Sequence, residues 1–215
     1  MKLSVSRLAS LLLAILWLNA PAFAAGKPDK PAKKSSKDEV VTVTTPQGVI
    51  RLVLFDDTPL HKANFLKKAG SGFYNGTTFH RVIDNFMIQG GDSNSKDADP
   101  MNDGMGKPDE PTIPAELVGH VHNYGAVAAA RTGGPAGTPS SSTQFYLVEN
   151  HDGTHFLDAQ YTVFGQVIQG LDVIDKIAKL PKDGRDRPLS DAKMTMKVEK
   201  LKRKKITKLY GYKYE

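Results

Sequence analysis

One short stretch of the sequence, FHRVIDNFMIQGGD at residues 79–92, combines residue types that can act together chemically. If Arg81 lies on a strand, alternation places it on the face opposite His80, and a turn at the DN pair brings Gln89 back beside it. A fixed cation then stands next to an apolar pocket. An ordinary surface arginine beside core residues explains this stretch equally well when it is taken alone. The residues of interest are one guanidinium, two large apolar side chains and one amide: Arg81, Phe86, Met87 and Gln89.

The surrounding pattern indicates a mainly β fold that would position these groups. Branched residues in VVTVTT and VIRLVLF flank Pro46-Gln47-Gly48, which predicts a β-hairpin. Many short strands with only two helices exclude a doubly wound sheet and favour an antiparallel barrel or sandwich. Further strands are expected in TTFHRVI, FMIQGGD, GAVAAAR, TQFYLVEN and YTVFGQVI, and in the alternation of Met194, Met196 and Val198.

Two segments carry the signals of amphipathic helices. In the first, Thr58 can cap the helix, Pro59 takes its first position, and apolar residues recur at helical spacing until Gly70. The second is LDVIDKIAKL at residues 171–180, with a proline directly beyond its end. The segment from 92 to 114 is long for a loop in a compact domain, and loops of that length tend to be functional or mobile.

Other chemistries find weaker support in the sequence. His80 is adjacent to Arg81, but strand alternation points it to the other face, which favours a structural role. The Asp-rich run at 92–103 lacks the central Gly and terminal Glu of a calcium loop, and no G-x-S-x-G elbow surrounds the serines at 140–142. Without cysteine or a helical HExxH pattern, loop or surface histidines are the favoured interpretation, so we expect neither metal nor cofactor. Four histidines are candidate ligands on paper: His120, His122, His151 and His155.

Three separated segments together carry a specific resemblance. FHR followed by FMIQGGD, then GAVAAARTGGPAGTPSSSTQFYLV, then HFLDAQYTVFGQVIQGLDVID resemble, in order and spacing, the motifs of cyclophilin-type peptidyl-prolyl cis-trans isomerases. The likeness covers roughly residues 40 to 200. It implies a closed eight-stranded antiparallel barrel capped by two α-helices, and an enzyme that isomerises X–Pro bonds without metal or nucleotide.

Carried over by position, the resemblance implies one catalytic residue, Arg81. It implies that the proline ring and the substrate backbone are bound by ten others: Phe86, Met87, Gln89, Ala130, Arg131, Gln144, Tyr146, Phe156, Leu157 and Tyr161.

Three of these positions depart from the best-known eukaryotic pattern and resemble bacterial members instead. Arg131 stands where Asn is usual, Phe156 where Trp is usual, and Tyr161 where His is usual. Because Phe156 lacks the indole N–H donor, we expect weak cyclosporin binding. The segment SNSKDADPMNDGMGKPDE is longer than the eukaryotic loop and is expected to alter access beside the proline site.

The N-terminus has the order of a secretory signal peptide at residues 1–24. Lys2 and Arg7 precede an apolar run, which is followed by Ala22-x-Ala24. A membrane anchor is the alternative, but the apolar run of about a dozen residues is shorter than the roughly 20 that a bilayer span requires. The chain has no cysteine for disulfides or lipidation, and we expect export to a bacterial periplasm.

The formal net charge of +6 is concentrated in two flanks. Residues 25–38 are expected to form a flexible Lys/Pro-rich linker and 202–215 a basic C-terminal tail, on either side of an isomerase domain at 39–201. This distribution argues against nucleic acid as a partner. For the tail, two interpretations remain open: contact with an anionic membrane surface, or a charged extension of the terminal strand. We expect a monomer.

The expected partners are proline-containing segments of unfolded or partly folded exported proteins. A second class of function is a chaperone or scaffold that binds such segments in the same groove with little turnover. Arg81 beside Phe86 and Gln89 favours the enzyme, because binding alone would not require the arginine.

Overall fold

The computed structural model describes residues 35–214. The predicted signal peptide at 1–24 and most of the predicted linker at 25–38 lie outside the described residues. Strand β1 begins at Lys37, ahead of residue 39, where the sequence placed the start of the domain.

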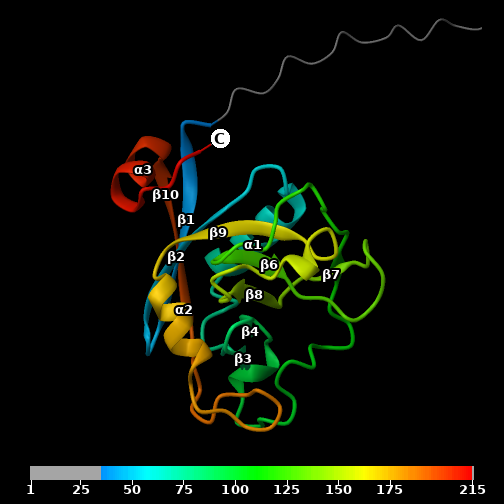
Figure 1. Cartoon of the computed structure of the whole chain (residues 1–215). Helices are drawn as coiled ribbons and strands as arrows, with labels where there is room; N and C mark the ends of the chain where they lie inside the picture. The colour runs from blue at the N-terminus through cyan, green and yellow to red at the C-terminus, as the bar shows by residue number, and fades with distance from the viewer. Residues whose placement is uncertain (1–34, 215) are drawn as a thin grey trace, which may run out of the picture. The chain divides into compact units, whose positions relative to one another are not determined.

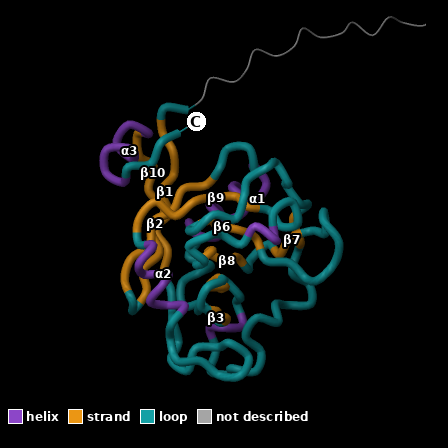
Figure 2. Tube along the Cα trace, in the orientation of Figure 1, coloured by secondary structure: helices purple, strands orange, loops and turns teal. Residues whose placement is uncertain are grey.

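Regular structure in the described part of the chain is mainly β. The strands are β1 (Lys37–Thr45), β2 (Gly48–Leu54), β3 (Arg81–Ile83), β4 (Met87–Gly90), β5 (Thr112–Ile113), β6 (Ala126–Ala129), β7 (Ser140–Ser141), β8 (Phe145–Val148), β9 (Val163–Gln169) and β10 (Thr195–Lys202). The helices are α1 (Pro59–Gly70), α2 (Leu171–Ala178) and α3 (Arg203–Tyr210), with short 3₁₀ turns η1 (Asn94–Lys96) and η2 (His155–Leu157). Figure 2 shows the long loops, in teal, that separate β4 from β6 and β6 from β8.

Eight of the strands form one antiparallel sheet in the order β10-β1-β2-β9-β6-β8-β4-β3. The predicted hairpin is confirmed by the pairing of β1 with β2. The predicted closed barrel is wrong, because the edge strands β10 and β3 share no ladder among the described residues. The segments ahead of these two strands are joined by a bridge between Thr78 and Lys193. A 3.0 Å bond from the Phe79 N–H to the Ala192 carbonyl and a 2.8 Å bond from the Met194 N–H to the Thr77 carbonyl form this contact. That contact precedes both β3 and β10, so the ladder never extends along their length.

Both predicted helices are confirmed, and a third is present. Helix α1 packs against β9 and β10, whereas α2 packs against β2, β3 and β4. The expectation of only two helices is wrong, since α3 follows β10 directly and lies beside it (Figure 1). None of the helices in residues 35–214 combines the length and the apolar composition that a membrane crossing needs.

The main core lies on one face of the sheet, as period-two alternation requires. In β2, Ile50 and Leu52 point into this core, together with Leu147 of β8 and Val127 of β6. Both α1 and α2 close the same core, and Phe65 of α1 packs edge-to-face on a sheet aromatic ring.

The opposite face of the sheet carries two smaller apolar clusters. One joins Val40 of β1 and Val53 of β2 to Ile206 of α3. The other surrounds Met87 and Tyr146, which alternate with the core residues of β4 and β8. The residues singled out in the sequence gather at this second cluster, on the face of the sheet that the main core leaves free.

Candidate active site

Strand register brings the arginine, the amide and the tyrosine into one row. Arg81 of β3 pairs with Gln89 of β4, Gln89 pairs with Tyr146 of β8, and Tyr146 pairs with Ala128 of β6. Residues directly opposite each other in neighbouring antiparallel strands project from the same face. The sequence prediction that Arg81 and Gln89 lie side by side is therefore confirmed.

An open pocket of about 130 Å³ lies over this row, smaller than the roughly 300–1,000 Å³ typical of sites for drug-sized ligands. Its apolar lining includes Met87, which is buried, and Leu157, which is half-buried, and its charged lining residues are Arg81 and Arg131. Nine of the eleven predicted site residues line it: Arg81, Phe86, Met87, Gln89, Ala130, Arg131, Tyr146, Leu157 and Tyr161.

The two remaining predicted residues lie next to the pocket. Phe156 was expected among the apolar groups that hold the ring, but its side chain is 72% exposed and lies outside the pocket lining. It stacks on Phe86, with ring centroids 5.7 Å apart, and so forms part of the rim. Gln144 lines a neighbouring cleft instead, which it shares with Gln89 and with the loop at 104–107.

A tight turn between β3 and β4 positions Phe86. Asn85 has φ 57°, in the left-handed region that Asn tolerates better than most residues. The Phe86 carbonyl then accepts hydrogen bonds from the N–H groups of Glu149 and Asn150, at 2.9 and 3.2 Å. The end of β8 thereby fixes the backbone that presents the Phe86 ring to the pocket.

The Arg81 guanidinium is exposed and makes no hydrogen bond or ion pair with any residue in the described range. Its donors therefore remain available to a ligand above Met87. Arg131 differs, because it stacks on Tyr161 at 4.2 Å and donates to the Gly134 carbonyl at 2.9 Å. Of the two arginines at the pocket, Arg81 is the one whose charge is not already engaged.

An amide chain links the pocket to the long loop. Gln89 donates from Nε2 to Gln144 Oε1 at 2.9 Å, and Gln144 donates from Nε2 to the Gly104 carbonyl at 3.1 Å. The carboxylate of Asp92 holds this loop closed by accepting the N–H of Gly106 at 3.0 Å. The loop that the sequence placed beside the site is therefore bonded to a site residue.

Sequence reasoning missed the group behind Tyr146. His122 lies in a loop, as expected, but its side chain is fully buried and not at the surface. Its Nε2 lies 2.9 Å from the Tyr146 hydroxyl and its Nδ1 lies 2.8 Å from Asp158. Burial lowers the pKa of His122, and the hydrogen bond to Asp158 offsets only part of that effect. No local spacing signals this contact, because the three residues come from separate segments.

His80 is buried and does not line the pocket, which agrees with the predicted structural role. Burial lowers its pKa, and neither ring nitrogen has a hydrogen-bond partner among the described residues. His80 is accordingly a neutral packing residue and has no place in the pocket.

The sequence model of the cyclophilin-type peptidyl-prolyl cis-trans isomerases matches residues 40–198, which include every residue of the pocket. The chain belongs to the cyclophilin family. It is accordingly a peptidyl-prolyl cis-trans isomerase, EC 5.2.1.8, and the family's substrates are proline-containing peptides.

Named relatives agree with this assignment. This cyclophilin is 36% identical over 159 residues to peptidyl-prolyl cis-trans isomerase-like 3 of Dictyostelium discoideum, covering 70% of the chain and 89% of the relative. It is 39% identical over 151 residues to a peptidyl-prolyl cis-trans isomerase of Acinetobacter baylyi, covering 66% and 73% of the two chains. The crystal structure of a Cryptosporidium parvum cyclophilin shares its fold, with a TM-score of 0.60 and 23% identity over 75% of this chain and 98% of that one.

Proposed function

We propose that this cyclophilin accelerates X–Pro isomerisation during the folding of exported proteins, with Arg81 as its catalytic residue. The observation that carries the proposal is the unpaired Arg81 guanidinium beside an apolar pocket. The remaining pocket residues would bind the substrate, with Met87 and Leu157 under the prolyl ring.

The chemistry of the reaction explains why an arginine is needed. An X–Pro bond rotates over a barrier of roughly 18–20 kcal/mol because twisting destroys amide resonance. As the bond twists, the prolyl nitrogen becomes pyramidal and gains a basic lone pair. A guanidinium aimed at that lone pair stabilises the twisted state more than the planar one, which lowers the barrier. Arg81 stays protonated and carries several donors, so it suits this role.

The required stabilisation is modest. Uncatalysed isomerisation takes about tens of seconds, so reaching milliseconds needs roughly 10⁴-fold acceleration, or about 5–6 kcal/mol. One charged hydrogen bond in an apolar pocket from which the bound peptide displaces water, together with alignment of the peptide by Gln89 and Arg131, is of this order. The step needs no nucleophile and no general base.

The refolding of an exported protein with a slow proline-limited phase tests the cellular role. The expected result is that catalytic amounts of this cyclophilin shorten that phase, whereas Arg81→Ala at the same concentration does not. If Arg81→Ala protects the client from aggregation as well as the wild type does, and neither protein shortens the slow phase, the groove acts as a holding site and the chaperone alternative replaces the enzyme.

Export to the periplasm is supported by the residue pattern at 1–24. Expression of the full chain in a Gram-negative host should release, on osmotic shock, a protein whose mass corresponds to a start at Ala25. An unprocessed chain that stays with the cytosolic fraction would remove the proposal of export, without affecting the isomerase activity.

A further inference from the structure

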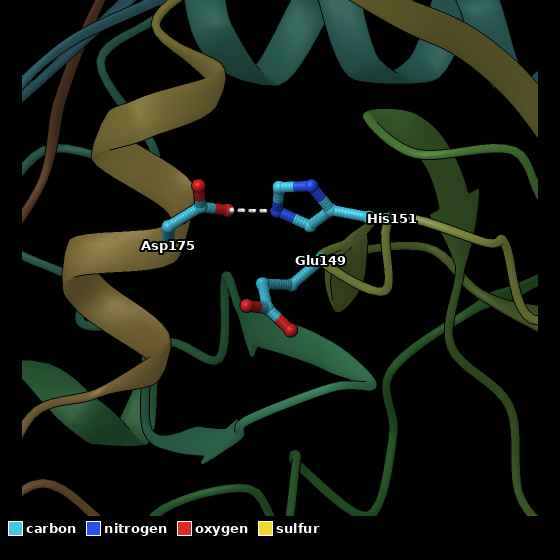
Figure 3. A group of neighbouring side chains, drawn as sticks. All are labelled: Glu149, His151 and Asp175. Atoms are coloured by element: carbon cyan, nitrogen blue, oxygen red, sulfur yellow. Dashed lines mark hydrogen bonds and ion pairs between the residues drawn. The ribbon is translucent and has the colours of Figure 1, made fainter.

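A second group of chemically active side chains lies outside the pocket, where the end of β8 meets α2. Glu149 follows β8 directly, His151 comes two residues later, and Asp175 projects from α2. Figure 3 shows His151 and Asp175 facing each other, with the Glu149 side chain close by. One ligand atom from each of the three lies within 4.8 Å of the other two.

Two of the three side chains are held in position by Tyr124. Its hydroxyl donates to Asp175 Oδ1 at 2.7 Å, and its ring stacks on His151 with centroids 4.1 Å apart. His151 Nε2 lies 3.3 Å from the same oxygen of Asp175. His151 Nε2 and Asp175 Oδ1 therefore already lie side by side, at a separation close to that of two ligands of one metal ion.

The Glu149 carboxylate is buried and only partly satisfied by hydrogen bonds. The residue is only 2% exposed, and its Oε2 has no hydrogen-bond partner among the described residues. The Asn85 N–H donates to this carboxylate, which leaves Oε2 without a donor. A buried polar atom without a partner costs free energy, and a bound cation would supply the missing partner.

The protein itself supplies no strong cation here. Within residues 35–214, no lysine or arginine forms an ion pair with Glu149 or Asp175, and His151 is the only basic group in contact with Asp175. Lys176, the neighbouring lysine on α2, pairs instead with Asp172. The cluster thus has two carboxylates and one imidazole around a point where negative charge exceeds positive charge.

We propose that Glu149, His151 and Asp175 bind a zinc ion. One imidazole nitrogen and two carboxylate oxygens are a donor set that suits Zn²⁺, whereas Mg²⁺ and Ca²⁺ prefer oxygen ligands alone. Zinc bonds of roughly 2.0–2.1 Å in a tetrahedron place ligand atoms about 3.3 Å apart. The exposed side chain of His151 can make the small movement that this requires. A water molecule would complete the coordination.

The Tyr124 hydroxyl would then orient a metal ligand, as partners of ligating carboxylates commonly do. The ion would tie the segment after β8 to α2, next to the N–H groups that hold the Phe86 carbonyl. The sequence discounted His151 as a ligand because no ligand spacing was visible along the chain. The two carboxylates come to it through the fold.

Titration calorimetry of the untagged full chain with ZnCl₂ tests the site. We expect one zinc ion per chain with a micromolar or lower Kd, and at least a tenfold loss of affinity in both Glu149→Gln and His151→Ala. Two matched controls, Asp172→Asn on the same helix and His120→Ala, should bind zinc like the wild type. Zinc binding that is equal in all variants, or absent at 100 µM zinc, would overturn the proposal.

A measurement on the wild type alone guards against a variant that fails to fold. Titration with Co²⁺ should give the intense visible absorption of a four-coordinate ion, and Zn²⁺ should abolish it whereas Mg²⁺ in excess should not. If the absorption is no stronger than that of Co²⁺ in buffer, the protein has no preformed four-coordinate site and the proposal is contradicted. Neither readout depends on isomerase activity, so the zinc proposal and the proposed function can fail separately.

Discussion

At the scale of single residues, the wall of the pocket is set by a hydrogen-bonded chain of three side chains. A carboxylate can only accept, so the short contact between Asp158 and His122 puts the proton on Nδ1. His122 Nε2 then accepts the Tyr146 hydroxyl. Burial raises the pKa of Tyr146 and lowers that of His122, which keeps both groups neutral near pH 7. The chain fixes the Tyr146 ring against the pocket without lending it a charge.

Tyr146→Phe should therefore reduce stability more than catalysis. The buried His122 Nε2 loses its donor, which should cost about 1–2 kcal/mol in the free energy of unfolding measured with urea. The ring remains in the pocket wall. Because kcat changes only when a contact with the transition state is lost, it should stay within about twofold of the wild-type value. Tyr161→Phe is the matched control, since the Tyr161 hydroxyl has no hydrogen-bond partner in the described part of the chain. A tenfold loss of kcat in Tyr146→Phe would show that the hydroxyl takes part in the reaction.

We expect Phe156, on the exposed rim of the pocket, to weaken cyclosporin binding. Its ring stacks on Phe86 but offers no hydrogen-bond donor. Phe156→Trp adds an indole N–H at the same place, and one net hydrogen bond of about 0.5–1.5 kcal/mol corresponds to roughly 2- to 12-fold tighter cyclosporin binding. Fluorescence titration of both proteins measures the ratio. Equal, tight affinity before and after the substitution would contradict the expectation that the wild type binds weakly.

At the scale of elements, α1 begins differently from the sequence prediction. Thr58 precedes the helix, but its hydroxyl donates to the Phe55 carbonyl and does not cap it. The carboxylate of Glu116 caps the helix, accepting the N–H groups of Leu60 and His61 at 3.0 Å each. Burial alone would raise the pKa of Glu116, but these bonds and the His61 ring lower it below 4.5. A residue far along the chain thus supplies the cap that local spacing assigned to Thr58.

Glu116→Gln should lower stability by about 1 kcal/mol at pH 7, because a charged cap is replaced by a neutral one. The depressed pKa means that the stabilisation is present above pH 4.5 and is lost as the pH falls through the folded-state pKa. The two proteins should therefore converge in urea unfolding as the pH falls below 4.5. A difference that is unchanged between pH 7 and pH 3 would show that the charge of Glu116 is not the cause.

Helix α3 replaces part of the predicted basic tail. Ile206 is buried against Val40 and Val53, and Arg203 pairs with Asp38 and Asp56. The helix is thus part of the folded domain, and its lysines form the outer surface.

In α3, removing a core contact should lower stability strongly, whereas removing surface charge should hardly change it. Ile206→Ala should cost about 2–4 kcal/mol in urea unfolding, because a fully buried side chain is truncated. Replacing the exposed Lys204, Lys205 and Lys208 by Gln should change stability by less than about 0.5 kcal/mol. Binding to anionic vesicles that is lost in the triple Gln variant and in high salt would support a membrane contact. If the wild type and the triple Gln variant bind vesicles equally, the lysines of α3 do not make a membrane contact.

At the scale of the whole molecule, the residue pattern of the sequence predicted those features that depend on residues close together in the chain. Period-two alternation separated Arg81 from His80, and helical spacing identified α1 and α2. Contacts between distant segments were beyond its reach, as with the burial of His122 behind Tyr146 and the Glu116 cap. Helix α3 was missed because its single buried residue, Ile206, gives no apolar stripe. The closed barrel came from family resemblance, and the short β3 leaves the sheet open.

The most direct test of the account is exchange NMR of an X–Pro peptide, without a coupled protease, for the wild type, Arg81→Ala and the exposed-arginine control Arg185→Ala. We expect peptide affinity to change by less than about fivefold in Arg81→Ala while kcat falls by at least about 10²-fold, because the guanidinium acts mainly on the twisted state. Arg185→Ala should match the wild type. If Arg81→Ala keeps its kcat, or if the folded wild type does not catalyse exchange, the proposed role of Arg81 is contradicted.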